Sequence, residues 1–238
     1  METDKSQQAV MAQMAEPTIN IKRVEDLVSE ITRLQITVDR FRFDLSPVEA
    51  LNLLAAQYTV AVNKRKGKLV LDKNTVSNLK ALAMYITQPV PKFGVMMCGT
   101  CGNGKTTLLY ALQGAINYLN SRNHFTFLSE YFKVGMQIMD AKEVVAISKN
   151  LNELKKVRSR SMLAIDDLGK EPAEVMDFGN LTSPVIDLLE YRYQHQLFTC
   201  ITTNLTSSEI SKKYGSRIAD RFNEMLDVIV FQDISYRH

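Results

Sequence analysis

The chain has 238 residues, of which 45% are hydrophobic and 23% charged, and its formal net charge is +3. This length suits one main domain with an appendage, and a charge of +3 permits contact with nucleic acid without arguing for it. No apolar run reaches the about 18 residues of a membrane span, and the polar start METDKSQQAV is unlike a secretory signal. The sparse, odd count of three cysteines favours a reducing, cytoplasmic setting.

The amino-terminal part begins with a polar stretch that has no periodicity, so residues 1–20 are expected to form a disordered tail. Apolar residues then recur at helical spacing from Val24 to Val38, with charges on the other face. This stripe predicts a helix that either binds a partner or packs on its own domain.

Two further helices are expected before the first strand. The sequence SPVE at Ser46–Glu49 is a capping box with proline at the first helical position, and it predicts a helix through about Val62. The basic turn NKRKGK at Asn63–Lys68 is either a solvated loop or a contact to DNA phosphates. A second helix is expected over Thr75–Ile86, where the prolines of TQPVP end it.

Residues 99–107 read GTCGNGKTT and match the pattern G-x-x-x-x-G-K-[ST] of a phosphate-binding loop. The glycines let backbone N–H groups surround an anion, and the following helix points its positive end at that anion. The lysine of such a loop reaches the β- and γ-phosphates, and the hydroxyl after it holds Mg²⁺. The expected nucleotide contacts are Gly99, Thr100, Cys101, Gly102, Asn103, Gly104, Lys105, Thr106 and Thr107, with Thr106 also a metal ligand.

The rest of the chain alternates strands with helices, which predicts a P-loop α/β core whose parallel sheet is covered on both faces. A helix over Lys105–Leu119 follows the first strand and the glycine loop. We expect a helical region over residues 21–90 and the nucleotide-binding core over residues 91–238. The expected strands are Phe93–Cys98, Phe125–Ser129, Met162–Asp166, Phe198–Thr203 and Val228–Phe231.

Polar residues follow two of these strands. Asp166 and Asp167 come at the end of an apolar strand, where ligands of open α/β sheets bind. Asp166 is therefore expected to face the Mg²⁺ held by Thr106, and Asp167 to act as base for the attacking water. The alternative is a pair of surface acids in a turn. Asn204 ends the next strand and is expected to position the attacking water or to read the γ-phosphate. The alternative is that it caps the helix that begins in TSSE.

Two arginines, Arg217 and Arg221, are spaced i, i+4 on a predicted helix whose other face is apolar. One hypothesis is that an arginine, preferably Arg221, contacts the γ-phosphate bound by a neighbouring subunit. The alternative is pairing within the helix with Asp220, Glu224 or Asp227.

Taken together these motifs resemble the AAA+ ATPases, and among them the bacterial helicase-loader and IstB-like branch of DnaC/DnaI type. The resemblance lies in GTCGNGKTT, LAIDDLG, ITTN and YGSRIADR and runs from about Phe93 onward. It implies an AAA+ core with a five-stranded parallel sheet and no carboxy-terminal helical lid. It also implies ATP and Mg²⁺ as ligands, Asp167 as catalytic base, Asn204 as first sensor, Arg221 as arginine finger and, through SYR, Arg237 as second sensor.

The same resemblance implies contact with single-stranded DNA through the segment between the second and third strands. That segment offers two aromatic rings and several cations, although a buried aromatic pair and a solvated charged helix are an equal alternative. The residues concerned are Tyr131, Phe132, Lys133, Lys155, Lys156, Arg158 and Arg160.

We therefore expect a cytoplasmic, self-associating ATPase with slow, DNA-stimulated hydrolysis that loads or remodels a replicative DNA helicase on single-stranded DNA. One alternative is an IstB-like ATPase helper of a transposase. Another is an ATP-controlled binding switch with little turnover, since Asp167 is one methylene shorter than the glutamate usual at this position. A small-molecule kinase is a weaker alternative, because the sequence gives no sign of an acceptor pocket or a closing lid.

Overall fold

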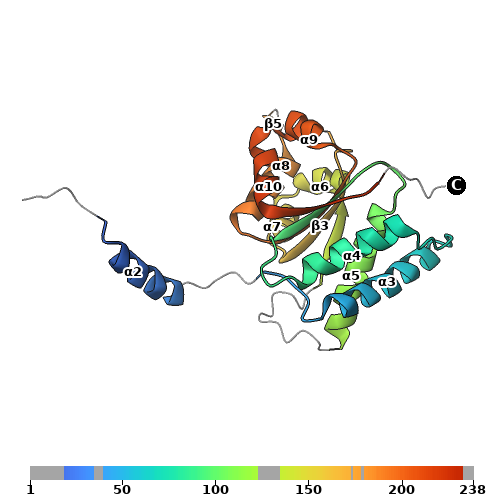
Figure 1. The fold of residues 1–238 in the computed structure, drawn as a ribbon. Coiled ribbons are helices and arrows are strands. Elements are labelled where there is room, and N and C mark those ends of the chain that lie inside the picture. Colours follow the sequence, from blue (N-terminus) through green and yellow to red (C-terminus); the bar gives the residue numbers. More distant parts are fainter. Residues whose placement is uncertain (1–18, 35–39, 123–134, 173, 178–179, 233–238) are drawn as a thin grey trace, which may run out of the picture. The chain divides into compact units, whose positions relative to one another are not determined.

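The computed structural model describes residues 19–34, 40–122, 135–172, 174–177 and 180–232 (Figure 1). The chain divides into two compact units, Met1–Val38 and Asp39–His238. No helix among the described residues is long and apolar enough to cross a membrane.

The first unit contains helix α2 (Ile21–Leu34), which confirms a helix where the apolar stripe predicted one. The side chain of Asn20 accepts a hydrogen bond from the backbone N–H of Arg23 at 3.0 Å and so satisfies one donor of the first turn. The apolar residues of the stripe stay exposed, from 37% at Leu27 to 55% at Val28. Within the described part of this unit, no other element covers them.

The centre of the second unit is a five-stranded parallel sheet in the order β2-β3-β6-β1-β7. Four of its strands lie where the sequence predicted strands, whereas the expected strand Phe125–Ser129 lies outside the described residues. The short edge strand β2 was not expected. The strands are β1 (Gly94–Cys98), β2 (Gln137–Asp140), β3 (Met162–Leu168), β6 (Phe198–Thr203) and β7 (Leu226–Val230).

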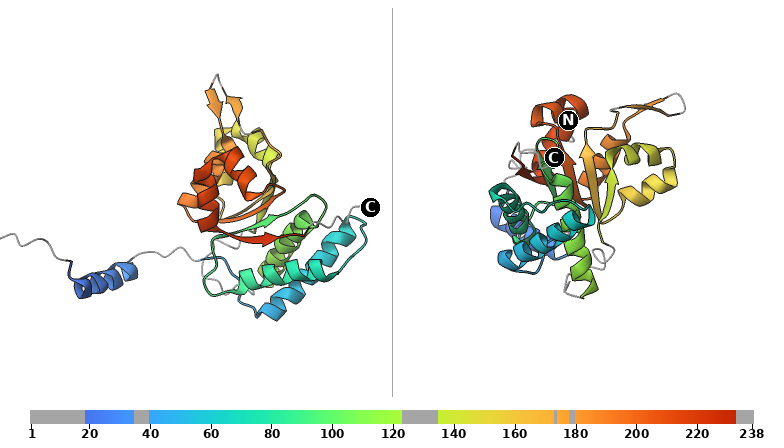
Figure 2. Two further views of the ribbon diagram at one scale, coloured as in Figure 1. Left: turned by 45° about the horizontal axis from the view of Figure 1, so that its top comes forward. Right: turned by 90° about the vertical axis from the view of Figure 1, so that its right-hand side faces the viewer.

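Helices cover both faces of this sheet, because successive side chains of a buried strand point to opposite sides. Val95 and Met97 of β1 pack with α3 (Pro47–Lys64), α4 (Lys73–Thr87) and α5 (Lys105–Ser121). Met96 packs in the opposite layer. Figure 2 shows helices on both faces of the sheet. That layer contains α6 (Ala141–Ser148), α7 (Leu151–Arg158), α8 (Pro184–Gln194), α9 (Ser207–Tyr214) and α10 (Ser216–Met225).

Helices α3 and α4 belong to the same compact unit as the sheet. Leu54 of α3 and Leu82 of α4 are fully buried in one cluster with Leu108 and Leu112 of α5. The capping box at Ser46 forms, with the backbone N–H of Glu49 donating to the serine hydroxyl at 3.3 Å. The unit thus begins at Asp39, whereas the sequence analysis drew its boundary at residue 90.

A small antiparallel hairpin lies between β3 and α8. It consists of β4 (Val175–Asp177) and β5 (Asn180–Thr182), which pair only with each other. The left view of Figure 2 shows it projecting from the layer that contains α8. The sequence analysis did not expect it.

Candidate functional site

The loop between β1 and α5 adopts a backbone that its glycines allow. Gly99, Gly102 and Gly104 have φ angles of 144°, 88° and 94°, in the region where residues with a Cβ are strained. A Cβ on Gly99 would lie 2.5 Å from the carbonyl oxygen of Phe231, so side chains are also excluded by space. Gly104 is the N-cap of α5 and supplies no side-chain cap, so the first N–H groups of this helix point toward the loop.

Lys105 is held inside this loop. Its Nζ donates to the carbonyl oxygens of Gly99 at 2.8 Å and Thr100 at 2.6 Å, and to Oδ1 of Asn103 at 3.1 Å. Only 5% of the residue is exposed. Burial lowers the pKa of this ammonium, while the nearby Cys101 and Asp167 oppose the change. The ammonium of Lys105 therefore lies within the glycine loop at the start of α5, which is a setting suited to a phosphate.

Asp166 of β3 meets the start of α5 at the same place. The hydroxyl of Thr106 donates to Asp166 Oδ1 at 3.1 Å, and the hydroxyl of Thr202 from β6 donates to the same oxygen. A carboxylate and a hydroxyl are oxygen ligands of the kind that Mg²⁺ takes. The structure brings Thr106 and Asp166 together, and their oxygens are of the kind that would hold Mg²⁺.

Asp167 occupies an irregular position in β3. The pairing with β6 shifts between Ile165 and Leu168, and Asp167 has a φ angle of 57°. Its backbone N–H donates to the hydroxyl of Thr202 at 2.9 Å. This local irregularity turns Asp167 toward the phosphate loop although it follows Asp166 directly. Thr202 thus contacts both acids, a role that the sequence did not signal.

The carboxylate of Asp167 also has a cationic partner. Lys170 donates to Asp167 Oδ2 at 2.5 Å, and this hydrogen bond raises the pKa of the lysine. The pair is partly exposed, with 44% of the lysine side chain and 26% of the aspartate side chain accessible. The turn that follows β3 therefore restrains the acid that the sequence proposed as catalytic base.

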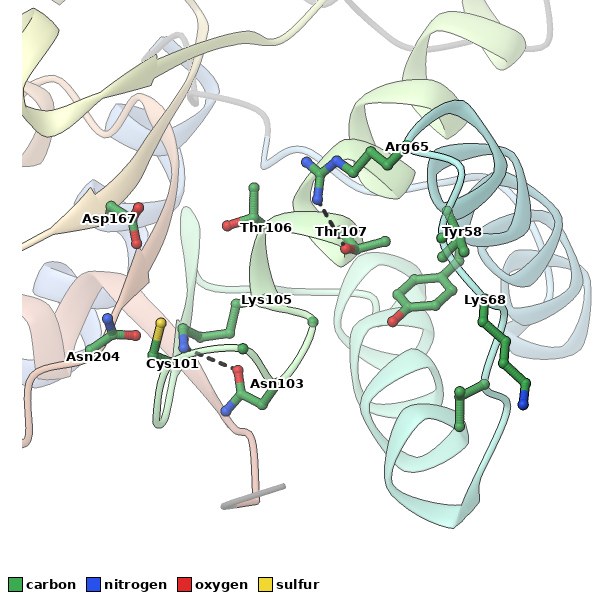
Figure 3. A pocket seen from close by; sticks show the side chains of 15 residues that line it. Tyr58, Arg65, Lys68, Cys101, Asn103, Lys105, Thr106, Thr107, Asp167 and Asn204 are labelled. Carbon is green, nitrogen blue, oxygen red and sulfur yellow. Dashed lines mark hydrogen bonds between the residues drawn. The ribbon is translucent and has the colours of Figure 1, made fainter. Parts of the chain in front are cut away.

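A pocket of about 220 Å³ brings part of the predicted site together (Figure 3), although Gly99, Thr100 and Asp166 do not line it. The loop from Cys101 to Thr107 forms one wall, and Asp167 and Asn204 lie at one end. The cap of α9 is Thr206, which accepts a hydrogen bond from the backbone N–H of Glu209 at 3.3 Å. Asn204 is therefore not the cap of that helix, and its place at the pocket is the one that the sensor hypothesis requires.

The opposite wall of the pocket comes from α3 and the turn after it, which the sequence analysis did not assign to the site. The basic turn that was expected to be solvated or to contact DNA lies against the phosphate loop. No spacing rule links Arg65 to Thr107, 42 residues later, so the basic composition of the turn was its only signal in the sequence. The lining residues of this wall are Tyr58, Val62, Arg65, Gly67, Lys68 and Val70.

The two arginines of α10 pair with a residue of α8 rather than within their own helix. Arg221 Nη1 lies 2.7 Å from Glu190 Oε1, and Arg217 Nε lies 3.5 Å from the same oxygen. Arg221 also lies over the ring of Tyr193, at 4.8 Å, and only 13% of its side chain is exposed, against 70% for Arg217. Neither arginine lines the 220 Å³ pocket of its own chain.

The remaining predicted contacts fall in two groups. Arg237 and the ring-bearing segment with Tyr131, Phe132 and Lys133 lie outside the described residues. The basic run is described at the end of α7, where Lys155, Lys156 and Arg160 are exposed. Lys156 pairs with Glu153 at 3.1 Å and Arg158 lies over the Tyr191 ring at 4.5 Å, so the run is partly engaged within the chain.

The fold of this chain is similar to that of several solved structures. The crystal structure of the DnaC helicase loader matches with a TM-score of 0.51 and 21% identity, over 69% of this chain and 94% of that one. The crystal structure of DnaI matches with a TM-score of 0.52 and 20% identity, over 83% and 96%. No protein-family model and no curated protein sequence matches the chain. The likeness bears out the predicted fold class: the chain shares the α/β fold of the DnaC and DnaI structures, with a five-stranded parallel sheet.

Proposed function

We propose that the chain binds and hydrolyses ATP in the pocket between the phosphate loop and the end of β3. The observation that carries this proposal is the hydrogen bond of 3.1 Å between Thr106 and Asp166, which are 60 residues apart. It brings together a hydroxyl and a carboxylate, the two side-chain groups that would hold Mg²⁺ beside a bound triphosphate. The phosphate-loop sequence GTCGNGKTT supports the nucleotide-binding part of this proposal.

The role of each residue in this proposal follows from its position in the site. The amides of the loop and the ammonium of Lys105 bind the phosphates, and Thr106 with Asp166 would hold Mg²⁺, which neutralises phosphate charge when bound. Asp167 orients a water molecule and accepts its proton during attack on the γ-phosphate. Asn204 lies beside Asp167 at the same end of the pocket and positions that water (Figure 3).

We expect the basal reaction to be slow. The carboxylate of Asp167 accepts a hydrogen bond from Lys170 at 2.5 Å, which occupies one of its oxygens and restrains the side chain. Its side chain is also shorter than the glutamate usual at this position. An ATP-controlled switch with little turnover therefore remains the second candidate, and the contact with Lys170 is the observation that favours it.

We propose that a second copy of the chain completes the site. Arg217 and Arg221 lie outside their own pocket and share Glu190, which holds Arg221 in one direction. An arginine placed in this way suits the γ-phosphate of a neighbouring subunit, where it would stabilise charge in the transition state. Hydrolysis per subunit should then rise steeply with protein concentration.

The biological task that we propose is the loading or remodelling of a replicative DNA helicase on single-stranded DNA, as a cytoplasmic protein. The support is the fold shared with a helicase loader and the exposed apolar stripe of α2, which suits a docking helix. In this proposal the basic run at the end of α7 contacts the DNA backbone. An IstB-like helper of a transposase is the alternative partner assignment.

Two measurements test this assignment. A pull-down with the replicative helicase is expected to succeed for the full chain and to fail when Val24, Leu27, Val28 and Ile31 are changed to Ser. ATP hydrolysis, measured with and without single-stranded DNA, is expected to rise with DNA and with protein concentration. Absence of helicase binding together with tight binding of duplex DNA would favour the transposition helper instead.

A further inference from the structure

The basic turn after α3 is held in a fixed shape at the pocket. The backbone N–H groups of Arg65 and Gly67 both donate to the carbonyl of Val62 at 3.1 Å, and that of Lys66 donates to Asn63 at 2.9 Å. Lys66 takes up the positive φ of 53° that closes the turn. Because α3 packs in the core with α5, this turn is presented to the pocket at a defined position.

Arg65 is tied to α5 by two contacts. Its Nη1 donates to the hydroxyl of Thr107 at 3.2 Å, and its guanidinium lies over the ring of Tyr110 at 5.0 Å. A guanidinium carries five N–H donors in a planar fork. The contact with Thr107 uses one of them, and stacking on the ring fixes the plane of the others. The group is therefore oriented before any ligand binds.

The order of groups along the pocket shows which part of a nucleotide Arg65 would meet. In Figure 3, Asp167 and Asn204 lie at one end, Lys105 and Thr106 in the middle, and Arg65, Tyr58 and Lys68 toward the other end. A triphosphate with its γ-phosphate beside Asp167 directs its α-phosphate and nucleoside toward the turn.

We propose that Arg65, anchored on Thr107, binds the α-phosphate of the nucleotide in its own subunit. Tyr58, Val62 and Val70 then line the place of the nucleoside. This inference rests on the proposed nucleotide binding and adds to it a cation from outside the phosphate loop. Since ADP and ATP share the α-phosphate, Arg65 contributes equally to the binding of both and does not distinguish them.

The experiment measures the affinity of the full chain for Mg·ADP and for Mg·AMPPCP, a triphosphate analogue that is not hydrolysed. Arg65→Ala is expected to weaken both by about tenfold, the order expected when a charge-assisted hydrogen bond is lost. The affinities of Arg65→Lys are expected to lie between those of the wild-type chain and of Arg65→Ala, because the charge remains while the planar fork is lost. Lys66→Ala is the matched control, since it removes the same charge from the same turn at a residue that does not line the pocket.

Each outcome bears on a different statement. Equal affinities for Arg65→Ala and Lys66→Ala, with tight binding by the wild-type chain, would overturn this inference alone. A loss confined to Mg·AMPPCP would place Arg65 at the γ-phosphate and would also overturn it. A wild-type chain that binds neither probe would overturn the proposed function and this inference with it.

Discussion

Thr106 at the start of α5 donates a hydrogen bond of 3.1 Å to Asp166 in β3. The contact exists because β1 and β3 both lie next to β6 and run parallel to it, so their carboxyl ends meet at one edge of the sheet. Thr202 at the end of β6 donates to the same carboxylate oxygen from between them. Three elements thus converge on the position that we assign to magnesium.

The role of Asp167 as base predicts a separation of binding from turnover. Asp167→Asn keeps the size of the side chain and its backbone contact with Thr202 but removes the proton acceptor. We expect ATP hydrolysis to fall by about 10²-fold or more, with ADP affinity within about twofold of wild type. Steady-state hydrolysis and equilibrium binding measure the two quantities. Glu174→Gln, an exposed change outside the pocket, is the control, and unchanged turnover in Asp167→Asn would reject the assignment.

The placement of Arg221 predicts complementation between defective subunits. Arg221→Ala is expected to reduce hydrolysis on the order of 10³-fold while nucleotide binding persists. Mixing it with Lys105→Ala should restore activity, because one variant supplies an intact pocket and the other an intact arginine. Arg122→Ala, an exposed arginine at the end of α5, is the control. If mixing restores nothing, or if Arg221→Ala loses nucleotide binding, the arginine does not act across subunits.

A buried hydrogen-bond network around Glu171, shortly after Asp167 in the chain, predicts that removing one of its donors lowers stability. Glu171 is buried and accepts hydrogen bonds from the backbone N–H of Gly169 at 2.9 Å and from the hydroxyl of Tyr214. Burial and this hydrogen bond raise the pKa of Tyr214. Tyr214→Phe leaves the carboxylate short of a donor, and we expect a loss of about 1–3 kcal/mol in the free energy of unfolding.

Urea denaturation followed by circular dichroism gives that free energy. Tyr118→Phe removes a hydroxyl from an exposed tyrosine of α5 and should change the free energy of unfolding little. Equal stabilities of the two variants would mean that the hydroxyl of Tyr214 contributes nothing to the network.

The environment of Lys105 predicts how nucleotide affinity depends on pH. Burial lowers the pKa of its ammonium from the ordinary lysine value of 10.5, and a bound phosphate favours the charged form. By linkage, affinity for the phosphate is complete below this lowered pKa and is lost as the pH rises through it. ADP titrations across this range should show the decline for wild type but not for Lys105→Arg, whose guanidinium stays charged. If the affinities of wild type and Lys105→Arg fell with pH in the same way, Lys105 would not be the source of the decline.

Local patterns were sufficient to predict much of the fold and the site. The glycine spacing of the phosphate loop and the apolar strand before Asp166 each follow from short-range rules, and both lie where they were expected. The edge strand β2 has only four residues and runs directly into α6, so periodicity gave too few positions to distinguish it.

Long-range relationships could not be obtained in this way. The contact of Arg65 with Thr107 depends on how α3 packs against α5, which no local rule specifies. The pairing of Arg221 with Glu190 joins α10 to α8, although acidic residues closer in sequence were the expected partners. The positive φ of Asp167 is likewise set by its strand pairing with β6 rather than by the residue itself.

The central claim is that a magnesium–nucleotide complex binds between the phosphate loop and the acids of β3. Its most direct test is the equilibrium binding of Mg·ATP to the wild-type chain and to Lys105→Ala, measured by calorimetry. The account predicts saturable binding of one nucleotide per chain and a large loss of affinity in the variant. No saturable binding by the wild-type chain, or equal affinities of the two proteins, would contradict it.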